Sequence, residues 1–140
     1  MSNNKRSFFN EIGFKPTIEK LVDLTAKLYL EDDNPWVVAY SGGKDSSACL
    51  QLMWRALEKI KSEKKTIKPL YVITTDTLVE NPVVATWVKT SLDLLRNKAK
   101  EKGLPIFPSL LTPNIEETFW VNLIGKGYPA PNTKFRWCTE

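Results

Sequence analysis

The sequence predicts an α/β fold in which helices flank a parallel sheet. Short apolar segments rich in β-branched and aromatic residues alternate with longer segments of helical periodicity, in the order helix, strand, helix, strand, helix, strand. Strands connected through helices run parallel, with right-handed crossovers. The length of 140 residues, with 42% hydrophobic and 26% charged residues, is that of one ordinary globular domain.

The N-terminal part divides into an arm and the first helix. Residues 1–16 are polar and basic, then aromatic, and we expect them to form an arm that docks on the domain at 17–140. Thr17 is a suitable cap for a helix whose apolar residues recur on one face. That helix ends in an acidic turn, and the first strand is expected at 36–40.

A polar, glycine-containing loop at 41–47 follows this strand and opens the next helix. Gly42 and Gly43 allow positive φ and a close approach of the backbone to an anion. The helix start adds free N–H groups, Lys44 adds positive charge, and Asp45 could hold a magnesium ion that neutralises a polyphosphate. Further donors are the hydroxyls of Ser41, Ser46 and Ser47. The sequence therefore predicts a nucleotide phosphate site, although neither a Walker A loop nor a GxGxxG pattern is present.

The following helix carries an apolar stripe that includes Cys49, which we expect to be a buried structural cysteine. After a charged connector, a second strand at 70–75 ends at Asp76. An aspartate at the carboxyl end of a parallel strand lies where open α/β sheets bind ligands. Asp76 could contact the magnesium or the ribose of a nucleotide, or it could be a turn residue or helix cap.

The C-terminal half continues the alternation. Asn81-Pro82 is expected to open a helix that ends before Gly103, and a proline-containing strand at 104–111 suits an edge of the sheet. A short helix and a loop rich in glycine and proline follow. Because only three strands are visible, we expect an incomplete domain, the N-terminal part of a longer protein.

Three strings of residues resemble the PP-loop ATP pyrophosphatases, in the branch that includes phosphoadenylylsulfate reductases: Ser41-Gly-Gly-Lys-Asp-Ser46, Thr74-Thr-Asp-Thr77 and Lys134-Phe-Arg-Trp-Cys-Thr139. Two further stretches, 76–84 and 118–131, resemble the DndC-type sulfurtransferases of bacterial DNA phosphorothioation. The resemblance covers residues 18–140 and implies an adenine nucleotide alpha hydrolase-like (HUP) fold.

The resemblance implies that the protein splits ATP into AMP and pyrophosphate to adenylate a DNA backbone phosphate, so that sulfur can replace an oxygen. Lys44, Asp45 and Arg136 would be catalytic, and Asp45 would hold Mg2+. Lys134 and Arg136 would contact phosphates, and Asp76 would lie beside the nucleotide. Cys138 would be one ligand of a 4Fe-4S cluster, completed by cysteines outside this chain. Implied partners are DNA, other proteins of the phosphorothioation complex, and a cysteine desulfurase as sulfur donor.

Two alternatives remain open. A sulfonucleotide reductase uses the same fold but needs a nucleophilic cysteine in a C-terminal tail. A non-catalytic ATP-binding module could instead regulate a DNA-modifying complex. Pyrophosphate release distinguishes the enzyme from the module, and preference for adenylyl sulfate over ATP identifies the reductase.

The composition bears on the kind of partner, on the catalytic and metal sites that are possible, and on where the protein is located. The net charge of +4 suits an anionic partner. With no histidine, imidazole acid–base catalysis and histidine metal sites are excluded. The sequence has no apolar run long enough to span a membrane and no secretion signal, so we expect a cytoplasmic protein with no membrane partner.

Overall fold

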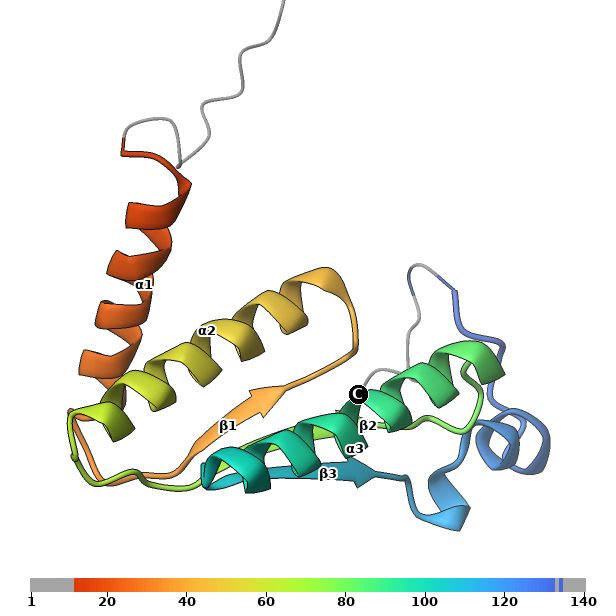
Figure 1. Ribbon diagram of the computed structural model, residues 1–140. Helices are drawn as coiled ribbons and strands as arrows, with labels where there is room; N and C mark the ends of the chain where they lie inside the picture. Colours follow the sequence, from red (N-terminus) through yellow and green to blue (C-terminus); the bar gives the residue numbers. More distant parts are fainter. Residues whose placement is uncertain (1–11, 133, 135–140) are drawn as a thin grey trace, which may run out of the picture.

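The computed structural model describes residues 12–132 and residue 134. The elements are helices α1 (Phe14–Tyr29), α2 (Lys44–Ser62) and α3 (Pro82–Lys102), strands β1 (Trp36–Ala39), β2 (Leu70–Thr75) and β3 (Ile106–Leu111), a 3-10 turn η2 (Ile115–Glu117) and a π-helical turn η3 (Val121–Gly125) (Figure 1). The α/β prediction is confirmed.

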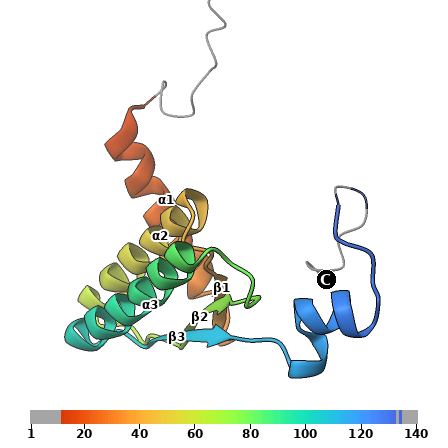
Figure 2. The same cartoon turned by 90° about the vertical axis from the view of Figure 1, so that its right-hand side faces the viewer.

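The three strands form a parallel sheet in the order β1-β2-β3. Both crossovers therefore run in the same direction, and α2 and α3 lie on the same side of the sheet (Figure 2). Under these helices, Leu70 and Val72 of β2 have 0% of their surface exposed. On the opposite face, the in-register residues Val37, Tyr71 and Phe107 remain 60%, 40% and 48% exposed, because no described helix covers them.

Helix α1 packs on α2, and its last residue, Tyr29, lies in a cluster of side chains near the start of β1. Tyr29 is fully buried, with its ring edge against Trp36 at a centroid distance of 5.5 Å. The Tyr29 hydroxyl donates to the carbonyl of Lys68. The Lys68 ammonium lies over both rings and pairs with Asp32 at 2.6 Å. This cluster fixes the connection between α1 and β1 and so the place where β1 begins.

The predicted ends of α3 are confirmed. The Asn81 side chain accepts a hydrogen bond from the Val83 amide at 2.9 Å, and Pro82 occupies the first helical position. Gly103 ends the helix in the left-handed conformation at φ 58°. Lys61 of α2 donates to the Gly103 carbonyl at 3.0 Å, which joins the C-terminal ends of the two helices.

Two local predictions were wrong. Helix α1 begins at Phe14 rather than at Thr17, which is buried and donates its hydroxyl to the Gly13 carbonyl at 2.7 Å. Pro16 does not prevent this because amides of a first helical turn need no helical partner. Cys49 is exposed, not buried. It lies on the apolar face of α2 one turn before Met53, at a point that no described segment covers.

The last described segment also differs from the single short helix that the sequence suggests. It forms the separate turns η2 and η3, which lie beyond the carboxyl end of β3. Among the described residues, none of the helices has both the length and the apolar character that crossing a bilayer requires.

Candidate functional site

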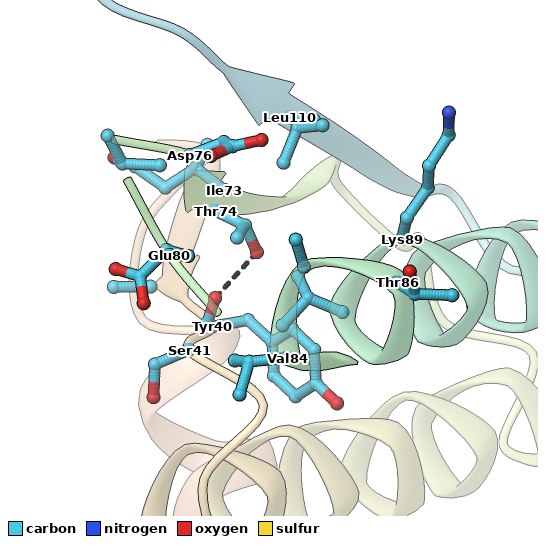
Figure 3. Close-up of a pocket in the computed structure, with 14 residues that line it drawn as sticks. Tyr40, Ser41, Ile73, Thr74, Asp76, Glu80, Val84, Thr86, Lys89 and Leu110 are labelled. Carbon is cyan, nitrogen blue, oxygen red and sulfur yellow. Dashed lines mark hydrogen bonds between the residues drawn. The ribbon is translucent and has the colours of Figure 1, made fainter. Parts of the chain in front are cut away.

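The polar loop starts from a point that β2 holds in place. Tyr40 follows β1, and its amide donates to the Ile73 carbonyl at 2.8 Å. The Tyr40 carbonyl accepts the buried hydroxyl of Thr74 at 2.5 Å (Figure 3). Hydrogen bonds from both sides of Tyr40 therefore fix the backbone immediately before Ser41.

The backbone of the loop has the form of an anion site. Gly42 has φ 75°, in the region that L side chains rarely adopt, and Gly43 is extended as the N-cap of α2. The first helical hydrogen bond runs from the Ser47 amide to the Gly43 carbonyl at 3.0 Å. No side chain of the described residues caps the helix, so within them the amides of its first turn have no side-chain acceptor. These amides and the helix dipole favour an anion at this point.

Ser46 closes the loop. Its hydroxyl donates to the Gly43 carbonyl at 3.1 Å and accepts from the Ser41 amide at 3.3 Å. The Ser41 and Ser46 hydroxyl oxygens are 3.2 Å apart. The two serines at the ends of the six-residue string are therefore neighbours in space, and both present hydroxyls at the mouth of the loop.

Lys44 and Asp45 form an ion pair at 2.8 Å, with 89% and 88% of their side chains exposed. A pair this exposed adds little to stability, and both groups can turn toward a ligand at small cost. Mg2+ on a polyphosphate needs only one or two carboxylates, with phosphate and water oxygens completing the shell. Asp45 can supply that carboxylate, and Gly42 permits the phosphate to approach the backbone closely.

A cavity of about 710 Å³ lies beside the loop (Figure 3). It opens between the carboxyl ends of β1 and β2 and the first turns of α3, the place where open α/β sheets bind ligands. Its size is that of a small-molecule site. The polar side chains on its wall belong to Tyr40, Ser41, Thr74, Thr75, Asp76, Glu80, Thr86 and Lys89.

Asp76 is a turn residue in the structure, and its position leaves open the ligand contact that the sequence also suggests. Its Oδ1 accepts the Leu78 amide at 2.8 Å, which makes it a turn residue, and its own amide donates to the Leu111 carbonyl at 2.8 Å. It also lines the cavity, as a ligand contact requires. Asp76 does not cap α3, because Asn81 does.

Two charged residues of the cavity wall were missed in the sequence. Glu80 lies in the turn between Asp76 and the start of α3, and its carboxylate accepts the Thr77 hydroxyl at 3.3 Å. Its place in the short connection between the end of β2 and the start of α3 was a usable signal. Lys89 follows Ala85 by four residues on α3 and therefore shares its face, which becomes informative only once that face is known to line a cavity.

Of the remaining candidate residues, the structure describes Lys134. Lys134 is exposed, and its amide donates to the Asn132 side chain at 2.9 Å. Arg136 and Cys138 lie outside the described residues. Within residues 12–132 and 134, no three His, Cys, Asp or Glu side chains gather as metal ligands, so the described part does not fit an iron–sulfur cluster.

No family model and no curated protein match the sequence. Among solved structures, the chain is similar to the U34-tRNA thiolase NcsA of Methanococcus maripaludis, solved with its 4Fe-4S cluster, at 14% identity and TM-score 0.49 over 91% of this chain and 39% of that one. It therefore spans about two fifths of NcsA. A universal stress family protein of Burkholderia pseudomallei follows at 20% identity and TM-score 0.37, over 66% of this chain and 76% of that one. Yeast FAD synthetase in complex with FAD matches at 17% identity and TM-score 0.37, over 79% of this chain and 41% of that one.

Proposed function

We propose that the protein binds ATP with its phosphates in the loop at 41–46 and splits it between the α and β phosphates. The observation that carries the proposal is the loop itself. Gly42 at positive φ, the uncapped start of α2 and two converging serine hydroxyls lie at the carboxyl end of β1, next to a cavity of small-molecule size.

In this proposal the first-turn amides of α2 and the Ser41 and Ser46 hydroxyls hold the leaving pyrophosphate. Donors fixed before the reaction stabilise the negative charge that accumulates on that group. Magnesium bound to Asp45 would neutralise part of that charge. Lys44 turns from Asp45 toward the phosphates, and the cavity beside Asp76 accommodates the nucleoside.

We further propose that the activated group is a DNA backbone phosphate, which is adenylated so that sulfur can replace an oxygen. The support is the resemblance of 76–84 and 118–131 to DndC-type sulfurtransferases. The partners would be DNA, the other proteins of the phosphorothioation complex and a cysteine desulfurase. A cluster ligated by Cys138 belongs to the same proposal, and no step here depends on it.

Release of inorganic pyrophosphate from ATP and magnesium tests the proposal, in the presence and absence of DNA. Asp45→Ala should reduce release at least a hundredfold while leaving the unfolding curve unchanged, because the carboxylate is exposed and, among the described residues, pairs with Lys44 alone. Asp33→Ala, at an exposed aspartate in the turn before β1, is the matched control and should release pyrophosphate at the wild-type rate.

Wild-type turnover in Asp45→Ala would remove the role assigned to this carboxylate. ATP binding without pyrophosphate release, with DNA and partner proteins present, would favour a regulatory module. Faster turnover of adenylyl sulfate than of ATP would favour the reductase. Transfer of labelled sulfur to DNA tests the finer proposal independently of the first step.

A further inference from the structure

The indole of Trp87 faces the phosphate loop although the two are far apart in sequence. A Cβ added to Gly42 would lie 3.4 Å from both Cδ1 and Nε1 of Trp87. These two atoms form the edge of the indole that carries its N–H group. The donor edge of the ring, rather than its apolar benzene side, is therefore the part nearest to the loop.

The first turns of α3 hold Trp87 in this place. Val84 and Val88 line the cavity, and Val88 Cγ2 lies 3.0 Å from the same added Cβ at Gly42. Asn81 and Pro82 fix the start of the helix, and Trp87 follows in its second turn, beside Gly42.

Core packing does not account for the side chain. Trp87 has 61% of its surface exposed, whereas tryptophan is highly buried on average. An indole nitrogen can only donate, and among the described residues Trp87 Nε1 has no hydrogen-bond acceptor. An indole donor that no described residue accepts from therefore lies beside the loop proposed to hold an anion.

We infer that the Trp87 indole N–H donates a hydrogen bond to a phosphate oxygen of the ligand in the loop. The inference rests on the proposed function, because it requires that the loop bind a polyphosphate. It adds a donor from α3 to those that the loop and α2 supply, so the polyphosphate is also held from a second helix.

Titration calorimetry with magnesium pyrophosphate, followed in parallel by tryptophan fluorescence, tests the inference on the full chain. Trp87→Phe keeps an aromatic ring but removes the donor together with the pyrrole part of the indole. It should weaken binding about tenfold, the order expected for one hydrogen bond to a charged oxygen, and should abolish the fluorescence change. Trp120→Phe, at another exposed tryptophan with 56% exposure, is the matched control and should change neither.

Trp87→Ala separates donation from simple support of the loop. If the ring only supports Gly42 by contact, Trp87→Phe will bind like the wild type and only Trp87→Ala will bind weakly, which overturns the inference. Equal affinity in all three proteins overturns it as well. If the wild type itself binds neither pyrophosphate nor ATP, the proposed function fails, and the inference fails with it. Circular dichroism verifies that each variant is folded.

Discussion

Gly42→Ala should damage the loop far more than Gly43→Ala, although the two glycines are adjacent. Gly42 has φ 75°, and an added Cβ would lie 3.0 Å from Val88 Cγ2. Gly43 has φ −77°, an ordinary value, and its added Cβ would lie 3.4 Å from the Ser41 hydroxyl oxygen. The added methyl group therefore causes backbone strain and a steric clash at Gly42, and neither at Gly43.

The magnitudes follow from these geometries. A left-handed conformation costs an alanine about 1–2 kcal/mol, and forcing a methyl group into a close contact costs about 1–3 kcal/mol. Gly42→Ala should therefore lower the free energy of unfolding by about 2–5 kcal/mol. For Gly43→Ala, the smaller entropy of the unfolded chain gains about 0.4–1 kcal/mol and the poorer N-cap costs a similar amount, so the net change should be near zero.

Urea unfolding followed by circular dichroism measures both variants, and calorimetry with magnesium pyrophosphate measures binding. Adding Val88→Ala removes the clash but not the strain. In that background Gly42→Ala should cost only about 1–2 kcal/mol. If Gly42→Ala and Gly43→Ala unfold at the same urea concentration and bind with equal affinity, the loop does not have the shape described here.

Two further predictions concern stability. Burial raises the pKa of Tyr29 to about 12, so the folded state keeps a proton that the unfolded state loses from pH 10 upward, and this contribution to stability is full below pH 10 and lost toward pH 12. Tyr29→Phe should therefore be about 1 kcal/mol less stable than the wild type at pH 8, because it loses the hydrogen bond to Lys68. The difference in stability should vanish near pH 11. Urea unfolding at both pH values measures it, and a difference that does not change with pH would contradict the prediction. Asn81→Ala should cost about 1 kcal/mol in thermal unfolding by removing the cap on Val83, whereas Asn97→Ala, exposed in the interior of the same helix, should cost nothing.

The elements that the sequence predicted well are those with local signals. Asn81-Pro82 and Gly103 mark the ends of α3 because capping and left-handed φ depend on the residue in place and its immediate neighbours. The parallel direction of the strands follows from their connection through helices, whereas their order in the sheet comes from the structure. Within Ser41 to Ser46, the hydrogen bonds that Ser46 makes with Ser41 and Gly43 are likewise local.

What the sequence did not predict depends on where other elements end. The stripe on α2 identifies its apolar face, but not how far along that face the neighbouring segments extend, so Cys49 was expected to be buried. Glu80 and Lys89 become site residues only through the cavity that α3 makes with β2. The approach of Trp87 to Gly42 joins two segments whose spacing in the sequence carries no periodic signal.

The contact between Gly42 and Val88 limits what the six-residue string can do on its own. A designer who copied Ser41 to Ser46 into the strand–helix turn of an unrelated scaffold would transfer the glycines and the serines but not the wall of α3 behind them. Without the contact to α3, the backbone from Gly42 to the start of α2 would adopt other turns, and the donors would no longer point to one place. A successful graft therefore has to carry the first two turns of α3 as well, so the smallest transferable unit of this site is two segments rather than one motif.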